Sequence, residues 1–162
     1  MISADKKYIL LSLISFFIIA FSSYSLSQNS LEEELKTQFN LAKELYNKEK
    51  YFDAITELKR LLFFDTHNRY AYSANELIGE SYKMGAKFSD AIRYFFIAGL
   101  HASSNEQFFN TRIEIVKINI LRRTISRAFT LLDSLETDER FSAKKDEITY
   151  WRGWAYIFDD KW

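Results

Sequence analysis

The residues best suited to acid–base or metal chemistry are few and scattered along this chain. Its two histidines, His67 and His101, are 34 residues apart, and neither has a second histidine at the spacing of a metal site. Asp159 and Asp160 are adjacent, so in a turn their carboxylates point apart. The sequence also has no Gly-rich phosphate loop, nucleophile elbow or zinc-binding helix motif. We therefore expect a protein that is not an enzyme and that has no catalytic residues, cofactor or metal.

The charge and cysteine content of the sequence excludes further classes of function. Lys plus Arg and Asp plus Glu number 22 each, and the two signs are interspersed, as in "KELYNKEKYFDAITELKR". A nucleic-acid-binding protein needs a basic stripe or patch, so nucleic acid is not an expected partner. The single basic cluster, Arg122, Arg123 and Arg127, is interpreted as a solvated turn and helix start. The chain has no cysteine, which rules out disulfides and thiolate chemistry.

Small and large apolar residues recur every 37 residues. One column is Ala54, Ala91 and Ala128; a second, of mostly small residues, is Ala42, Gly79, Val116 and Gly153; a third, of large residues, is Tyr51, Phe88, Ile125 and Trp162. A fixed period of this length, with a helix-turn-helix pattern inside it, is typical of an α-solenoid. The alternative is an ordinary helical bundle whose hairpins are similar in length.

Each copy contains two amphipathic segments separated by a short break. In the first copy the apolar residues at helical spacing are Leu35, Phe39, Ala42 and Leu45, then Ala54, Leu58, Leu61 and Leu62. In the second, Gly85 marks the predicted end of the first helix. Ser104 and Gln107 are predicted to form a capping box at a later helix start. The predicted fold class is all-α, with repeats near 35–71, 72–108 and 109–145 and a partial repeat at 146–162.

The first two copies, "LAKELYNKEKYFDAITEL" and "LIGESYKMGAKFSDAIRYF", resemble the tetratricopeptide repeat (TPR) family, in an exported bacterial form. The residues that carry the resemblance best are Gly79, Tyr82, Ala91, Phe95 and Ala98. The third copy keeps Ala128 and Leu132 but has Asn119 where the family has an aromatic residue. The resemblance implies a right-handed α-solenoid of about seven helices. The family repeat is 34 residues, so we expect the three extra residues in the second helix or in the loop after it.

The resemblance also implies a concave face, formed by the first helix of each copy, that binds another protein or a peptide. Carried over by phase, its residues are Phe39, Lys43 and Tyr46; Glu76, Glu80 and Lys83; Ile113, Lys117 and Ile120; and Tyr150, Trp154 and Ile157. An alternative remains for two sets. The residue types favour Phe39, Ile113 and Ile120 as core residues, and Lys43, Glu80 and Lys117 as solvated charges.

The fourth copy, "DEITYWRGWAYIFDDKW", has a first helix rich in aromatic residues but no second helix. An uncovered aromatic patch is an association surface. Two interpretations follow: the chain is a fragment of a longer array, or its end is covered by a partner, including a second copy that self-associates through this helix.

The N-terminal segment has the layout of a secretory signal peptide. Lys6 and Lys7 precede an uncharged run over residues 8–26, and Ser25 and Ser27 offer small residues for cleavage. We expect residues 1–27 to be a signal peptide and residues 28–162 to be the TPR-like repeat domain, exported to the periplasm or envelope of a bacterium. The alternative is an uncleaved anchor over residues 8–26 in the inner membrane, which would be the only membrane contact.

Together these features predict an exported, non-enzymatic scaffold for protein–protein interaction in envelope assembly. The alternatives are a structural, self-associating repeat module, or a fragment of a larger TPR protein with a glycan- or envelope-related role.

Overall fold

The computed structural model describes residues 30–159, which form helices joined by turns and loops, with no strand. The all-α prediction is thus confirmed for this part of the chain. The proposed signal peptide (1–27), the alternative anchor (8–26), Asp160 and Trp162 lie outside the described residues. The helices are residues 30–47, α2 (Tyr51–Phe64), α3 (Ala71–Met84), α4 (Phe88–Leu100), α5 (Asn105–Leu121), α6 (Ile125–Thr137), a 3-10 helix η1 (Glu139–Lys144) and α7 (Lys145–Ile157). None of them is long and apolar enough to cross a membrane, a finding limited to residues 30–159.

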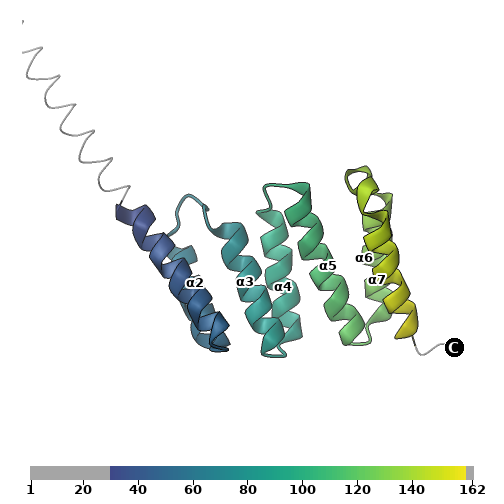
Figure 1. The fold of residues 1–162 in the computed structure, drawn as a ribbon, viewed down its shortest axis with the longest axis horizontal. Coiled ribbons are helices and arrows are strands. Elements are labelled where there is room, and N and C mark those ends of the chain that lie inside the picture. Colours follow the sequence, from purple (N-terminus) through teal and green to yellow (C-terminus); the bar gives the residue numbers. More distant parts are fainter. Residues whose placement is uncertain (1–29, 160–162) are drawn as a thin grey trace, which may run out of the picture. The chain divides into compact units, whose positions relative to one another are not determined.

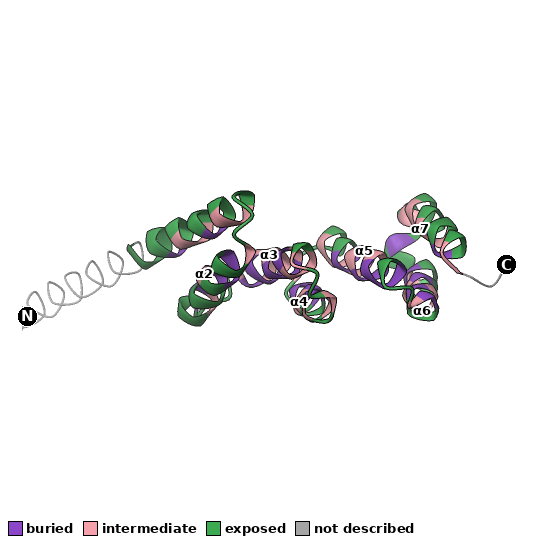
Figure 2. Ribbon diagram, turned by 90° about the horizontal axis from the view of Figure 1, so that it is seen from below, coloured by how far each residue is buried: buried purple, intermediate pink, exposed green. Residues whose placement is uncertain are grey.

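The chain divides into two units, residues 1–37 and residues 38–162. Within the second unit each helix packs chiefly against the helices next to it in sequence (Figure 1). Seen end-on, α3, α5 and α7 form one layer and α2, α4 and α6 form the other, with the buried residues between them (Figure 2). The second helices of the three hairpins, α2, α4 and α6, begin at Tyr51, Phe88 and Ile125. These starts are 37 residues apart, which is the period of the sequence repeat.

The turns inside the three hairpins share one backbone geometry, and equivalent turn residues are 37 positions apart. Glu49, Ala86 and Arg123 have φ values of 60°, 54° and 57°, although none of them is glycine. In each turn the amide of the next residue (50, 87 and 124) donates to the carbonyl oxygen five residues earlier (45, 82 and 119), at 2.9, 2.8 and 2.9 Å. This is the Schellman motif, which satisfies carbonyl groups at a helix end.

Small residues allow the two helices of a hairpin to approach closely. Ala42, Ala54, Ala91 and Ala128 are fully buried, and so is Val116. A Cβ atom added to Gly79 would lie 3.1 Å from the ring of Phe95 in α4, closer than ordinary van der Waals contact. Three members of the column of small residues identified in the sequence, Ala42, Gly79 and Val116, are therefore buried, while the fourth, Gly153, is exposed.

The third copy departs from the pattern because α5 is covered on several sides. Ile113, Ile115, Val116, Ile118 and Ile120 are all buried. Asn119 is buried as well, and it replaces the aromatic residue by bridging the helix to its turn. Its Nδ2 donates to the carbonyl oxygen of Ile115 at 2.8 Å, and its Oδ1 accepts from the Thr124 hydroxyl at 2.8 Å.

The connections between hairpins follow no common geometry. At the start of α5, Ser104 Oγ accepts from the Gln107 amide at 3.1 Å, as the capping box requires. The reciprocal bond differs from the prediction, because Gln107 Oε1 accepts from the amide of Ser103 at 2.8 Å rather than from that of Ser104. After α6, the 3-10 helix η1 fills the connection and buries Phe141 in the core.

We expect Ala86→Gly and Glu49→Gly each to raise the free energy of unfolding by about 0.5–1 kcal/mol. A residue with a Cβ atom is strained at positive φ by ~1–2 kcal/mol, and the greater flexibility of glycine in the unfolded chain offsets part of that gain. Urea unfolding followed by circular dichroism measures the change. Ser134→Gly, at an exposed position inside α6, is the control and should lower stability by about 0.5–1 kcal/mol. Loss of stability at all three positions would contradict the strained turns.

Candidate partner-binding groove

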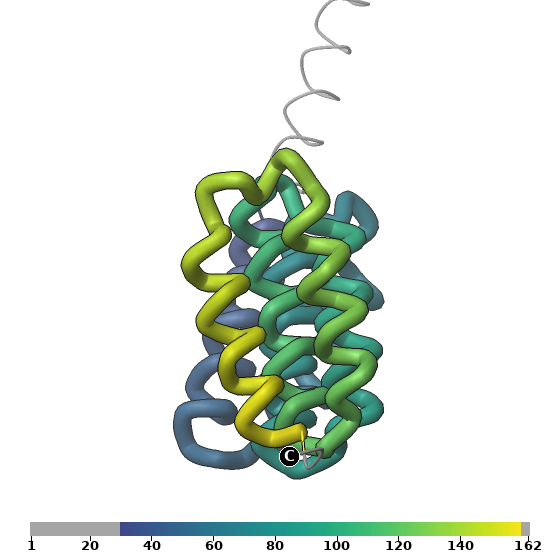
Figure 3. Tube along the Cα trace, turned by 90° about the vertical axis from the view of Figure 1, so that its right-hand side faces the viewer, coloured from purple at the N-terminus to yellow at the C-terminus, as the bar shows by residue number. Residues whose placement is uncertain are grey.

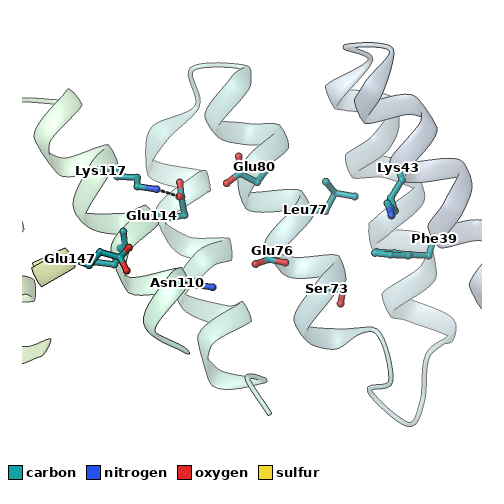
Figure 4. A pocket seen from close by; sticks show the side chains of 11 residues that line it. Phe39, Lys43, Ser73, Glu76, Leu77, Glu80, Asn110, Glu114, Lys117 and Glu147 are labelled. Atoms are coloured by element: carbon teal, nitrogen blue, oxygen red, sulfur yellow. Dashed lines mark hydrogen bonds and ion pairs between the residues drawn. The ribbon is translucent and has the colours of Figure 1, made fainter. Parts of the chain in front are cut away.

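The first helices of successive hairpins line a polar groove of ≈ 570 Å³. Its walls come from residues 38–47, from α3 and from α5, with one residue of α7 (Figure 4). The lining residues are Phe39, Lys43, Ser73, Glu76, Leu77, Glu80, Asn110, Ile113, Glu114, Lys117 and Glu147. Most of them form columns at the 37-residue step, so the groove is made of equivalent positions on neighbouring helices.

Six of the residues predicted for the concave face come together here. They are the first three members of two predicted columns, namely Phe39, Glu76 and Ile113, and Lys43, Glu80 and Lys117; the fourth members, Tyr150 and Trp154, do not line the groove. Ile113 is at the same time 2% exposed and part of the hydrophobic core, so it contributes to both surfaces.

The other six predicted residues do not line the groove. Ile120 is 5% exposed and belongs to the core. Tyr46 is half-buried, with its ring 5.5 Å from that of Tyr51. Lys83 is half-buried and forms ion pairs with two groove residues. The α7 residues Tyr150, Trp154 and Ile157 are exposed.

Sequence reasoning missed five groove residues: Ser73, Leu77, Asn110, Glu114 and Glu147. The signal was present in the helical spacing. Positions three before and one after Glu76, namely Ser73 and Leu77, lie on the same helix face as Glu76 and Glu80. The same offsets from Ile113 give Asn110 and Glu114, and the 37-residue step from Asn110 gives Glu147.

A lysine shared between two carboxylates joins α3 to α5 beside the groove. Lys83 Nζ lies 2.7 Å from Glu80 Oε2 and 2.6 Å from Glu114 Oε2. Glu114 also receives Lys117, at 2.6 Å through its other oxygen. The side chains of Lys83, Glu80 and Glu114 are 25%, 26% and 19% exposed, so water screens these pairs less than it screens pairs on the open surface.

The two carboxylates of this network have pKa values shifted in opposite directions. Burial raises the pKa of Glu80, and repulsion by Glu114 and Glu76 adds to that rise, while Lys83 only partly opposes it. Burial also acts to raise the pKa of Glu114, but hydrogen bonds from Lys117 and Lys83 outweigh it and hold the pKa below its ordinary value. Glu114 is thus the carboxylate that the network stabilises in its charged form.

Some groove charges form no ion pair within residues 30–159. Lys43 and Glu147 form no ion pair among the described residues. Lys43 lies only over the ring of Phe39, 6.0 Å from its centroid. Glu76 accepts a hydrogen bond from the Tyr72 hydroxyl at 2.6 Å, which keeps its carboxylate oriented without neutralising it. The groove therefore offers one cation near Phe39 and two carboxylates further along, as Figure 4 shows.

The scattered residues considered for acid–base or metal chemistry are not brought together. His67 and His101 are both exposed, and His67 Nδ1 lies 3.2 Å from the hydroxyl of Thr66. Within residues 30–159 no group of three or more His, Cys, Asp or Glu side chains is placed to hold a metal ion.

Comparisons of the chain with protein-family models, with curated proteins and with solved structures give no match. The interpretation of the groove therefore rests on its own residues.

We expect Glu114→Gln and Glu80→Gln to affect stability differently. The folded-state pKa of Glu114 is lowered, so its ionised form stabilises the protein above pH 4.5, and this contribution is lost as the pH falls through the lowered pKa. Glu114→Gln should therefore lower the free energy of unfolding at pH 7 by about 1–2 kcal/mol. The folded-state pKa of Glu80 is raised, so its ionisation opposes folding at pH 7, and Glu80→Gln should leave stability unchanged or raise it.

Urea unfolding from pH 7 down to pH 3 measures both effects. The difference between wild type and Glu114→Gln should shrink as the pH falls. Equal losses of stability in the two variants at pH 7 would contradict the assignment of Glu114 as the stabilised carboxylate.

Proposed function

We propose that this chain is a non-enzymatic, TPR-like α-solenoid scaffold that binds another protein through a peptide segment held in the groove. One observation carries the proposal: residues 37 positions apart, on three successive first helices, line one continuous groove. Such a surface suits an extended segment, because each helix offers the next part of the segment a similar set of positions. The recurring hairpin turns support the solenoid, since the same turn sets the same relation between the two helices of each hairpin.

The charges of the groove support a segment that carries a basic side chain. Glu80, Glu114 and Lys117 are engaged with one another or with Lys83, whereas Glu76 and Glu147 remain available as carboxylates. A lysine or arginine of the segment that lies beside either carboxylate would find an opposite charge there. Phe39 and Leu77 offer apolar contact at the other end, where Lys43 would favour an acidic group of the segment.

We further propose that the protein acts outside the cytoplasm, in envelope assembly. The support comes from the sequence: Lys6 and Lys7 followed by the uncharged run over residues 8–26 and by small residues suited to cleavage. A binding scaffold with no cysteine is compatible with an oxidising compartment, because it has no thiol to oxidise.

Selection from a random peptide library displayed on phage tests the groove. We expect the enriched peptides to contain Lys or Arg. One such peptide, labelled with a fluorophore and measured by anisotropy, should bind the double variant Glu76→Gln/Glu147→Gln about tenfold more weakly than wild type, because two charge pairs are lost. Glu139→Gln, an exposed carboxylate in η1 outside the groove, is the matched control and should leave binding unchanged.

A second variant, Asn110→Trp, fills the groove at an exposed position of α5 and should abolish binding. Unchanged binding to this variant would show that the peptides bind elsewhere and would refute the proposal.

A further inference from the structure

A second hollow, of ≈ 390 Å³, lies among the helices α4, α5 and α6 and shares no residue with the groove. We call it the α4–α6 hollow. In Figure 3, viewed along the row of helices, α6 and α7 lie on opposite sides, and the hollow is on the side of α6, whereas the groove includes a residue of α7. The apolar side chains of the hollow are Ile92, Phe96, Ile115 and Leu131.

The hollow is open because two tyrosines of the preceding hairpin have shorter counterparts here. One step of 37 residues earlier, the rings of Tyr82 and Tyr94 stack with their centroids 5.5 Å apart. Lys59 lies over both rings, and its Nζ donates to the Tyr82 hydroxyl at 3.1 Å. The residues equivalent to these tyrosines are Asn119 and Leu131, both of which line the hollow. The space that two rings occupy at one step is therefore left open at the next.

Two arginines line the hollow without a carboxylate partner in residues 30–159, Arg112 and Arg127. No aspartate or glutamate is among the described residues that line it. The position equivalent to Arg127 in α4 is Asp90, which pairs with Arg93 at 3.1 Å. The charge at this column is thus reversed in α6, and no neighbouring charge balances it there.

Arg112 is held in place by two aromatic rings. Its Cζ lies 4.8 Å from the ring centroid of Phe96 and 4.7 Å from that of Phe108. Such contacts use the flat face of the guanidinium group and leave the N–H groups at its edge free to donate. Burial lowers the pKa of Arg112, and no ion pair with a described residue offsets this cost. An anion bound at the edge of the guanidinium would offset it.

The remaining polar groups of the hollow limit what the rest of a ligand can be. Asn119 is 3% exposed, and its amide group already forms hydrogen bonds within α5 and to the turn after it. The Thr130 hydroxyl donates to the carbonyl oxygen of Ser126 at 3.0 Å. A peptide segment, of a partner or of this chain, would bring backbone N–H groups that find few acceptors here, and an N–H buried without a partner costs free energy. A hydrocarbon chain brings no such donor.

We propose that the α4–α6 hollow binds a small aliphatic carboxylate. Its hydrocarbon chain would lie against Ile92, Ile115 and Leu131, and its carboxylate would accept hydrogen bonds from Arg112 and Arg127. Such a ligand matches the hollow in each respect: it has one negative charge, acceptors but no donors, and an apolar body. This is a ligand site in addition to the groove.

Octanoate, titrated into the full chain by isothermal calorimetry, is the probe. We expect saturable binding at one site. Octan-1-ol has the same chain without the charge, so it should bind at least tenfold more weakly, because hydrogen bonds from arginine to a carboxylate are about twice as strong as neutral ones. A blocked leucine–glutamate–leucine peptide has both a carboxylate and apolar groups but adds backbone N–H donors, and it should also bind more weakly than octanoate.

Three variants locate the site. Arg127→Gln removes one of the two charges at an exposed position and should weaken octanoate binding about tenfold. Leu131→Tyr introduces the residue found at the equivalent position of α4, so it should fill the hollow and abolish binding while keeping both arginines. Arg122→Gln, an exposed arginine outside the hollow, is the matched control and should leave binding unchanged. Circular dichroism of each variant checks that it is folded.

Absence of saturable octanoate binding would overturn the proposal. Equal binding of octanoate and octan-1-ol would do the same, and so would equal effects of Arg127→Gln and Arg122→Gln. Tighter binding of the peptide than of octanoate would show that the hollow takes a protein segment instead.

Discussion

The helices of each hairpin meet at a point where one of them has no room for a large side chain. In the α3–α4 hairpin this point is Gly79, which lies against the fully buried ring of Phe95. The neighbouring hairpins have other residues at the positions of Gly79 and Phe95. These are Ala42 with Leu58 and Val116 with Leu132, and all four are buried. Protein interiors pack at nearly constant density, and the smallest residue of the first column, Gly79, goes with the largest of the second, Phe95. This contact fixes how closely, and in which rotation, the two helices lie.

The groove depends on that fixed rotation. Each first helix turns its small residue toward its own second helix. The residues three before and one after it, such as Glu76 and Glu80 around Gly79, lie about 60° and about 100° around the helix from it and line the groove. Repeated along the chain, this places Glu80, Lys83 and Glu114 within ion-pairing distance across two helices. The network ties α3 to α5, while the carboxylates of Glu76 and Glu147 and the ammonium group of Lys43 are left without ion-pair partners in the described part of the chain.

The 37-residue repeat of the sequence predicts the features that recur from one hairpin to the next. It does not predict contacts between particular side chains of neighbouring helices. Columns of Ala, Gly and large apolar residues indicate where helices touch, so the all-α fold and two of the groove columns could be predicted. The burial of Ile120 agrees with its interpretation as a core residue, because it lies on an apolar stripe at helical spacing. The network around Glu114 was missed because a glutamate on a helix face is solvated as often as paired, and only the neighbouring helix, with Lys83, distinguishes the two cases. The 3-10 helix η1 has no signal at the 37-residue step, since the connections between hairpins share no geometry.

The most direct test of the close helix approach compares the same substitution at two equivalent glycines. Replacing a glycine inside a helix by alanine gains about 1 kcal/mol from helix propensity alone. At Gly153, where the added Cβ meets nothing, Gly153→Ala should raise the free energy of unfolding by about that amount. At Gly79 the added Cβ would lie 3.1 Å from the buried Phe95 ring, and overpacking should outweigh the gain, so Gly79→Ala should lower stability by about 1 kcal/mol. Urea unfolding of both variants decides the question: changes of opposite sign are predicted, and an equal gain at both positions would contradict the account.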